Sequence, residues 1–352
     1  MYKNKICVVL GTRPEIIKLF PLIHTLKKNE FFVVFSNQHY SKKMSLNFFT
    51  ELKIDKIKYF FKNKNKKIFI NSFYKYLKSV FNKEKPTQII VQGDTNTSLL
   101  GCLAAREYSN SCKKKFPSIA HIEAGLRSND YSMPEEINRI IIDHNSDFLF
   151  VPTSIQKRNL INEGITSKKI HIVGNTIADS IEYLKKKIPK SPYKDYILLT
   201  FHRHELLENT QKLKRLINLI NKIANKFKKK ILFPIHPRTK KKLLSSKSKL
   251  NKNIKLISPQ NYLDFLSLIK YSDLILSDSG GLQEECCILN KEHITLRNNT
   301  ERPETIFLNS NIISNFNFKI IEKRIRYIMQ SKQQWTHPYK KNVSKKILDI
   351  IL

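Results

Sequence analysis

The sequence predicts an α/β protein made of two doubly wound parallel sheets that are joined by a short linker. The chain has 352 residues, which is more than one hydrophobic core usually serves, so we expect two domains of about 150–180 residues each. Short apolar segments that end in glycine or polar residues alternate with segments of helical spacing. This alternation is interrupted once, near residues 185–195, and then begins again.

The amino-acid composition indicates a folded globular protein. Hydrophobic residues make up 41% of the chain and charged residues 26%, so both domains can bury a core, and disorder, collagen and coiled coil fit poorly. No apolar run approaches the roughly 20 residues that a membrane helix needs, so we expect no membrane insertion. The first apolar run is short and is followed by Arg13, Pro14 and Glu15, which indicates a first strand and not a signal peptide.

Six apolar segments of the first half fit buried strands. They cover residues 5–11, 31–36, 88–94, 119–125, 148–153 and 169–175. Ile16, Phe20 and Ile23 have helical spacing, and helices are predicted over 13–28, after residue 94, and near 135–145 and 155–163. This βαβ alternation predicts a parallel sheet that is covered on both faces.

The segment 185–195 contains two prolines, a lysine run and few apolar residues, and we predict that it is the linker. The strands predicted after it cover 196–202, 230–236, 254–257, 273–278 and 293–296, with a helix over 210–226. The predicted domains are therefore 1–184 and 196–340. A terminal helix is predicted within 341–352.

The formal net charge of +35 is the most unusual number in the composition, and it raises the possibility of nucleic-acid binding. Only 12 of the 64 basic residues are arginine; excess lysine and asparagine is what an AT-rich genome would give. The lysines are scattered and are not interleaved with aromatic residues along one stripe. We therefore expect no specific nucleic-acid partner, although the charge favours anionic ligands in general.

The cysteines and histidines give no sign of a metal site or a disulfide framework. The five cysteines are Cys7, Cys102, Cys112, Cys286 and Cys287, and no two of them form a CxxC motif. With no export signal, they indicate reduced thiols and a cytoplasmic location. The ten histidines are not at metal-ligand spacing and no HExxH motif occurs, so we expect no metal and no cofactor.

In open α/β sheets, ligands bind outside the carboxyl ends of the strands, and three carboxylates of the first domain lie at or after predicted strand ends. They are Asp94, Glu123 and Glu135. Asp94 could instead be a helix N-cap. Glu135 lies four residues before Arg139, on one helix face, and the two could form a solvated pair. Crowded carboxylates have pKa values that are pushed apart, which suits acid/base chemistry.

The loops of the second domain are basic or rich in glycine. His202 and Arg203 follow its first strand, and His236 follows the next. Ser279, Gly280 and Gly281 open a helix whose backbone N–H groups could bind a phosphate. Glu285 follows in that helix and could accept ribose hydroxyls or merely favour the helix dipole. Together with Arg302 at another helix start, this division predicts a nucleotide diphosphate bound by the second domain and a sugar processed by the first.

The ordered motifs resemble those of the UDP-N-acetylglucosamine 2-epimerase family. The matching blocks are GTRPEIIK, QH at 38–39, GDT at 93–95, HIEAGLRS, PEEINR, VGNT at 173–176, HR at 202–203, HPRT, SDSGGLQEE and NTERPET. They extend from residue 11 to residue 305 in family order. The resemblance implies the GT-B fold, with two Rossmann-like domains, an active site in the cleft between them, and a last helix that crosses back to the first domain.

The loop GTRPE at 11–15 looks like that of the non-hydrolysing epimerases, which interconvert UDP-GlcNAc and UDP-ManNAc. Their mechanism eliminates UDP to give a 2-acetamidoglucal and then adds UDP back. The family resemblance further implies a homodimer and a role in surface-polysaccharide synthesis. A hydrolysing epimerase that releases UDP and free sugar is the first alternative, and a GT-B glycosyltransferase is the second.

Catalytic roles are implied position by position. Asp94, Glu123 and Glu135 match the family carboxylates of the acid/base chemistry, and which is acid and which is base stays open. His202 matches the histidine that assists the leaving UDP. Arg139 matches a basic residue near the diphosphate or its re-addition.

Other positions match residues that bind UDP. Arg13 and Lys18 match basic residues near the diphosphate, the turn Ser279–Gly281 matches the phosphate-binding turn, and Glu285 matches the ribose ligand. Gln38 and His236 are compatible with a second, activating UDP-GlcNAc.

Three features depart from the family pattern. Phe201 stands where glycine is frequent, His204 where arginine is frequent, and 340–342 is Lys-Lys-Asn in place of Gly-Asp-Gly. Phe201, the block PIHPRT at 234–239 and the short spacing from Glu123 to Glu135 mark a subgroup that is similar to epimerases of modified UDP-sugars, including diacetamido uronic acids. The Lys/Asn run at 60–70 matches no family loop, and Cys286 and Cys287 are predicted to be buried packing thiols.

Overall fold

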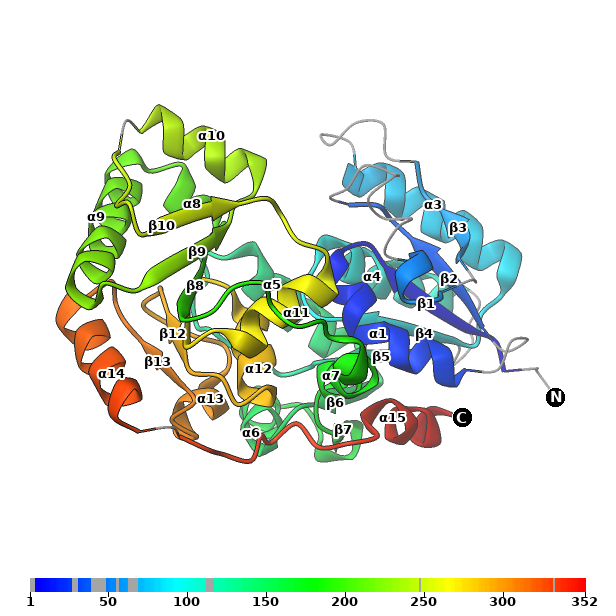
Figure 1. Ribbon diagram of the computed structural model, residues 1–352. Helices are drawn as coiled ribbons and strands as arrows, with labels where there is room; N and C mark the ends of the chain where they lie inside the picture. Colours follow the sequence, from blue (N-terminus) through cyan, green and yellow to red (C-terminus); the bar gives the residue numbers. More distant parts are fainter. Residues whose placement is uncertain are drawn as a thin grey trace. The chain divides into compact units, whose positions relative to one another are not determined.

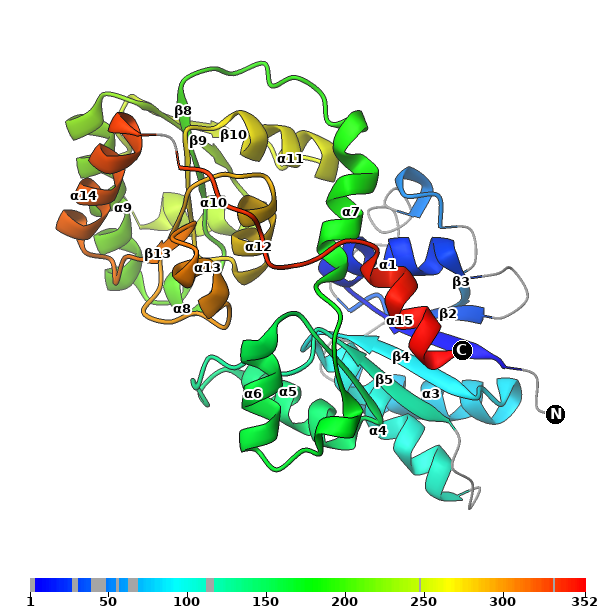
Figure 2. The same cartoon turned by 90° about the horizontal axis from the view of Figure 1, so that it is seen from below.

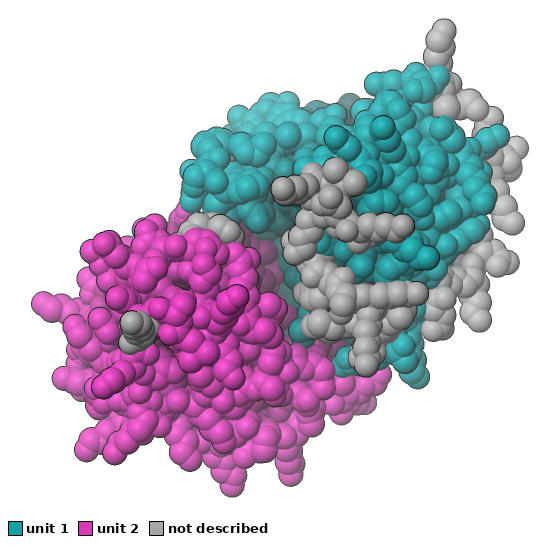
Figure 3. Space-filling model, turned by 90° about the horizontal axis from the view of Figure 1, so that it is seen from above, with its two compact units in different colours: residues 1–183, 338–352 teal, residues 184–337 magenta. Residues whose placement is uncertain are grey.

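The structure is a computed structural model that describes residues 4–26, 31–38, 49–54, 57–62, 69–111, 117–246, 248–331 and 333–352. His39, Cys112 and most of the Lys/Asn run lie outside these residues, as do the side chains of His204 and Glu205. The chain divides into two compact units (Figure 3). The first unit is Met1–Tyr183 with Pro338–Leu352, and the second unit is Leu184–His337.

The first unit contains a parallel sheet of seven strands within the described residues. They are β1 (Ile6–Leu10), β2 (Phe31–Phe35), β3 (Ile57–Phe60), β4 (Gln88–Gln92), β5 (Ser118–Ile122), β6 (Phe148–Val151) and β7 (Ile170–Ile172). Their spatial order is β3-β2-β1-β4-β5-β6-β7. The order reverses between β1 and β4, which is the switch point where open α/β sheets bind ligands.

Helices cover both faces of this sheet (Figure 1). They are α1 (Arg13–Thr25), α3 (Phe69–Glu84), α4 (Asn96–Ser111), α5 (Pro134–Asn145), α6 (Ser154–Asn162) and α7 (Thr176–Leu184), with a 3-10 turn at Ser167–Lys169. A second 3-10 turn, Lys185–Lys187, follows α7 at the start of the second unit. On one face, Phe73 and Leu77 of α3 pack with Val9, Val91 and Ala105 in a buried cluster. Burial on both faces explains why the central strands are continuously apolar.

The C-terminal segment belongs to the first unit. Helix α15 (Val343–Ile351) packs against α1 (Figure 2). The N–H groups of Val343 and Ser344 donate to the Asp179 carboxylate of α7, at 3.2 and 2.7 Å. Gly174 has φ +102°, and a Cβ there would lie 2.1 Å from the Tyr339 carbonyl oxygen, so only glycine fits where the returning chain passes.

The second unit repeats the same topology. Its described strands are β8 (Tyr196–Thr200), β9 (Lys230–Pro234), β10 (Ile254–Ile257), β11 (Leu274–Ser277), β12 (His293–Thr295) and β13 (Asn311–Ile313). They form a parallel sheet in the order β10-β9-β8-β11-β12-β13, which is the order of the first sheet without its last strand. Its switch point lies between β8 and β11.

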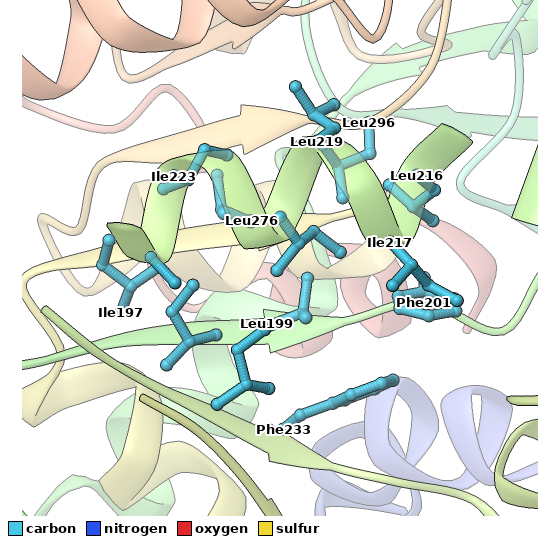
Figure 4. Close-up of a cluster of buried hydrophobic side chains, with 14 of the residues drawn as sticks. Ile197, Leu199, Phe201, Leu216, Ile217, Leu219, Ile223, Phe233, Leu276 and Leu296 are labelled. Carbon is cyan, nitrogen blue, oxygen red and sulfur yellow. The ribbon is translucent and has the colours of Figure 1, made fainter. Parts of the chain in front are cut away.

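The helices of the second unit are α8 (His204–Leu207), α9 (Thr210–Phe227), α10 (Pro237–Ser245), α11 (Tyr262–Tyr271), α12 (Gly280–Ile288), α13 (Pro303–Phe307) and α14 (Phe318–Gln330). Leu216 and Ile223 of α9 pack with Leu199 and Leu276 of the sheet (Figure 4). Phe201 is buried and contacts Phe233, with 4.7 Å between the ring centroids. Phe201 is thus a core residue at this end of β8.

The predicted fold class of two parallel-sheet α/β domains is confirmed. Strands β3 and β13 were not predicted. β3 is partly exposed and contains Lys58, and β13 has three residues, so neither presents a long apolar run. No helix in the described part of the chain is long and apolar enough to span a membrane.

Candidate active site

Two loops meet at the switch point of the first unit, and a buried carboxylate joins them. Glu15 Oε2 accepts the N–H groups of Gly11 and Thr12, at 3.0 and 2.6 Å. Its Oε1 accepts the hydroxyls of Thr95 and Ser98, at 2.8 and 2.9 Å. Burial raises the pKa of Glu15, and these hydrogen bonds oppose the rise. The loop after β1, which contains the half-buried Arg13, is therefore fixed to the loop after β4.

Asp94 follows β4 and forms an ion pair with Arg139 of α5. Arg139 Nε and Nη2 lie 3.0 and 2.5 Å from Asp94 Oδ2. Asn138 Nδ2 donates to the Asp94 carbonyl at 2.8 Å. The alternative that Asp94 caps α4 is wrong, since it is the Thr95 hydroxyl that accepts the Ser98 N–H, at 3.1 Å. The Asp94 carboxylate is therefore oriented by α5.

On α5 the structure distinguishes two adjacent glutamates. Glu136 is buried, and its carboxylate accepts Arg139 Nη1 at 2.6 Å and the N–H groups of Ser128 and Asn129 at 2.9 and 2.8 Å. Glu135 is exposed. Both glutamates are at spacings that share a helix face with Arg139, so the sequence alone did not identify Glu136 as the buried partner.

Glu123 follows β5 in a left-handed backbone conformation, with φ +69°. For a residue other than glycine, such a conformation costs of order 1–3 kcal/mol and persists where its surroundings fix it. Lys18 Nζ of α1 lies 2.5 Å from Glu123 Oε1, and both side chains are buried. Gln92, the last residue of β4, donates to Oε2. The Lys18 ammonium stabilises the charged carboxylate.

In the second unit, a buried aspartate fixes the loop that carries His202. Asp278 follows β11 and is fully buried. Its Oδ2 accepts the N–H groups of His202 and Arg203, at 3.0 and 2.9 Å. His202 Nδ1 lies 3.5 Å from Asp278 Oδ1, while the His202 side chain is 60% exposed. The backbone of His202 is thus fixed at the switch point and its ring remains accessible.

The glycine turn lies beside this loop, after β11. Gly280 and Gly281 are the first two residues of α12, so their N–H groups lie at the positive end of the helix. A Cβ at Gly280 would lie 2.2 Å from Glu301 Oε1 and 2.7 Å from Arg302 Nη1. At Gly281 a Cβ would meet no described atom within 4 Å. Gly280 is therefore required by packing, whereas Gly281 leaves open space.

Buried ion pairs orient Arg302 next to this turn. Arg302 Nη1 lies 2.6 Å from Glu301 Oε1, and Arg302 Nε lies 2.9 Å from Glu284 Oε1. Glu301 also pairs with Arg297, at 2.9 Å. Glu285 accepts a hydrogen bond from the Tyr262 hydroxyl at 2.8 Å. Glu301 and Tyr262 were not predicted from the sequence, since their partners are distant or buried and neither lies at a strand end.

The two positions predicted to contact an activating ligand lie in different units. Gln38 Oε1 accepts the N–H and the hydroxyl of Thr97, at 3.1 and 2.7 Å. His236 is exposed, and its Nδ1 accepts the Arg238 N–H at 3.2 Å as the N-cap of α10. Both side chains thus have structural contacts, and their ligand roles stay predictions.

The thiols of Cys7, Cys102, Cys286 and Cys287 are free and buried. Burial raises their pKa values, to about 12 for Cys102 and to about 11 for Cys287. Within the described ranges, no group of three or more His, Cys, Asp or Glu side chains could bind a metal ion.

The strand order of both units, with carboxylates at one switch point and a glycine turn at the other, defines an α/β enzyme of the GT-B fold class. Residues 23–352 match the family described as UDP-N-acetylglucosamine 2-epimerase. The chain belongs to this family. The relatives of the chain that are named below are epimerases, which are isomerases.

Three relatives illustrate the similarity. The chain is 45% identical to a UDP-N-acetylglucosamine 2-epimerase of Methanococcus maripaludis, over 98% of this chain and 97% of that protein. It is 34% identical to a UDP-2,3-diacetamido-2,3-dideoxy-D-glucuronate 2-epimerase of Pseudomonas aeruginosa, over 88% of each chain. The crystal structure of Methanocaldococcus jannaschii UDP-GlcNAc 2-epimerase in complex with UDP-GlcNAc and UDP aligns with a TM-score of 0.90 and 42% identity, over 99% of both chains.

Proposed function

We propose that this protein interconverts UDP-GlcNAc and UDP-ManNAc without net hydrolysis. The observation that carries the proposal is that the motifs of its family fall at the carboxyl ends of β4, β5, β8 and β11. These are the strand ends at which α/β sheets bind ligands. The relatives named for this reaction are similar over nearly the whole chain.

The first half of the reaction removes the C2 proton and breaks the bond between C1 and the diphosphate oxygen. Asp94, Glu123 and Glu135 are the candidates for the proton transfers at C2. The ion pair with Lys18 favours the charged carboxylate of Glu123, which can accept a proton, and Arg139 orients the carboxylate of Asp94. Reprotonation of the 2-acetamidoglucal on the opposite face, with re-addition of UDP, completes the epimerisation.

The departing UDP takes the electron pair of the C1–O bond and gains negative charge on its β-phosphate. In this proposal the N–H groups of Gly280 and Gly281 and the Arg302 guanidinium bind the diphosphate, with Ser279 at the N-cap of the same helix. His202 is the candidate to assist departure, and Arg13 the candidate to stabilise free UDP until it adds back. Glu285, oriented by Tyr262, is the candidate ribose ligand. Such groups stabilise charge that develops in the transition state.

The substrate could carry further substituents, because the Pseudomonas relative is named for a diacetamido glucuronate. We favour UDP-GlcNAc, since the relatives with 45% and 44% identity are both named for it. The hydrolysing epimerase and the GT-B glycosyltransferase remain the alternatives that an experiment must separate.

A proton NMR time course with UDP-GlcNAc in deuterated buffer tests the proposal. We expect UDP-ManNAc with deuterium at C2 and no lasting accumulation of UDP. Equal amounts of free UDP and free sugar would identify a hydrolysing enzyme. Absence of C2 exchange with every UDP-2-acetamido sugar tried would refute the epimerase and favour a glycosyltransferase.

We also propose that the protein acts as a homodimer in the cytoplasm and supplies a sugar for surface polysaccharide. Sedimentation equilibrium would give the mass of the particle, and a monomer at working concentration would refute the dimer.

Nucleic-acid binding is the alternative suggested by the net charge. Binding of nucleic acid that weakens with salt and is not displaced by UDP would favour this alternative.

A further inference from the structure

A group of buried ionisable side chains near the carboxyl end of β5 has no role in the reaction proposed above. His121, in β5, and Asp143, on α5, are both fully inaccessible to solvent at their side chains. His121 Nδ1 lies 2.7 Å from Asp143 Oδ1. A histidine in the middle of an apolar strand has no packing advantage over valine or isoleucine, so its contacts must explain its presence.

The contacts of this pair lead to the two turns that carry the candidate carboxylates. His121 Nε2 lies 2.9 Å from the carbonyl oxygen of Gly93, the residue before Asp94. Asp143 Oδ2 accepts the N–H of Gly125, two residues after Glu123, at 3.2 Å. The two side chains therefore connect the turn after β4 to the turn after β5.

The contacts of Asp143 extend to two further side chains. Both ring nitrogens of His121 lie within hydrogen-bond distance of an oxygen atom, one of Asp143 and one of Gly93, so the ring is fixed at both ends. Asp143 also pairs with Arg127, at 2.8 Å, and Arg127 pairs with Glu163, at 2.6 Å. Burial acts to raise the pKa of Asp143, but His121 and Arg127 outweigh burial and lower it. The group thus connects His121, Asp143, Arg127 and Glu163 through successive contacts.

Both turns depend on unusual backbone conformations. Gly93, Glu123 and Gly125 have φ of +69°, +69° and +76°. Their hydrogen bonds to the sheet, such as Glu123 N–H to the Phe150 carbonyl at 3.0 Å, fix each turn to its own neighbour strand. The contacts of His121 and Asp143 add a connection between one turn and the other.

We propose that Asp143, acting through His121, is a positioning residue that sets the Asp94 turn and the Glu123 turn at the separation that proton transfer at C2 requires. This inference rests on the proposed function. A misplacement of about 1 Å between groups that react with one substrate can reduce the rate about 100-fold. Substrate binding by the second unit does not depend on this separation.

The experiment uses the full-length protein and compares two variants with a matched control. Asp143→Asn removes the negative charge that pairs with Arg127 and replaces one acceptor oxygen with an N–H donor, so His121 Nδ1 must then accept this N–H or lose the contact. His121→Asn keeps a donor near Asp143 and is too short to reach Gly93. Glu84→Gln is the control, because Glu84 is also a buried carboxylate with ion pairs, although its lysine partners are partly exposed. These partners, Lys5 and Lys58, lie at the amino ends of β1 and β3.

We expect kcat for UDP-GlcNAc epimerisation and C2 deuterium exchange to fall about 100-fold in both variants, with KM and UDP affinity close to wild type. Hydrogen exchange should accelerate in the peptides that cover 93–97 and 121–128. Glu84→Gln should lower the melting temperature and leave kcat unchanged.

Wild-type kcat in either folded variant would overturn the inference, as would a melting-temperature loss alone, like that of the control. If Asp143→Asn does not fold, His121→Asn decides the question. If the wild-type protein itself shows no C2 exchange, the proposed function fails and this inference falls with it. If the wild type is active and both variants are as active as the wild type, the positioning role is refuted and the proposed function stands.

Discussion

At Gly281, the second residue of α12, a substitution by alanine should have opposite effects on stability and on ligand binding. A methyl group at Gly281 would meet no described atom within 4 Å, and its φ is not in the left-handed region. Gly281→Ala should therefore stabilise the helix by about 0.4–1 kcal/mol, which raises the melting temperature of a unit of this size by about 1–4 °C. The space that the methyl group fills is the space that a bound phosphate would need.

If the turn binds the diphosphate, that methyl group competes with it. An extra methyl group in a close-packed site costs about 1–3 kcal/mol, which corresponds to about a 5- to 150-fold increase in the Kd for UDP. Gly280→Ala is the contrasting variant, because its Cβ would lie 2.2 Å from Glu301 Oε1. It should lower both stability and UDP affinity.

Calorimetric titration with UDP measures the Kd of each variant, and a thermal melt measures its melting temperature. The combination expected for Gly281→Ala is a higher melting temperature with weaker UDP binding. Unchanged UDP affinity in Gly281→Ala would show that no phosphate approaches this turn, and the assignment of Ser279, Gly280 and Gly281 would be wrong. A lower melting temperature would contradict the open space at that position.

Three further predictions concern ionisable side chains. Glu123→Gln should reduce turnover about 10²–10⁴-fold and keep UDP binding, and it should lower the melting temperature because the buried Lys18 loses its carboxylate; full turnover would exclude Glu123 from acid/base chemistry. His202→Asn should slow UDP departure more than it weakens substrate binding and should barely change stability, since the side chain is 60% exposed; a normal kcat would exclude its role. Burial acts to raise the pKa of Glu84, but its contacts with Lys5, Tyr59 and Lys58 outweigh burial and lower the pKa to about 2. The pKa of a glutamate in an unfolded chain is about 4.3. The contribution of the charged Glu84 to the free energy of unfolding is therefore complete above that pH and disappears as the pH falls toward 2. Melts of the wild type and Glu84→Gln should therefore differ most above pH 5 and converge near pH 2, and a difference independent of pH would contradict this pKa.

The sequence identified the strand ends at which polar residues gather, because parallel strands buried on both faces are apolar runs whose limits are easily recognised. It placed Asp94, Glu123, His202 and the Gly280 turn correctly after β4, β5, β8 and β11. It missed β3, whose exposed lysine interrupts the apolar pattern.

The partners of these residues could not be predicted. Lys18 and Glu123 are 105 residues apart, and their contact depends on how α1 packs against the sheet beside β4. The same holds for the choice between Glu135 and Glu136, which both share a helix face with Arg139. Only Glu136 lies against the loop that contains Ser128 and is buried there.

By itself, then, the amino-acid order determined two repeated α/β units and the family to which the chain belongs, since local periodicity and contiguous motifs are properties of neighbouring residues. Only the tertiary structure decided which charges are paired, which carboxylate is buried, and that His121 and Asp143 connect two turns. The physical reason is that ion pairs and buried hydrogen bonds depend on the register of strands and the packing of helices, which bring together residues that are distant in the chain.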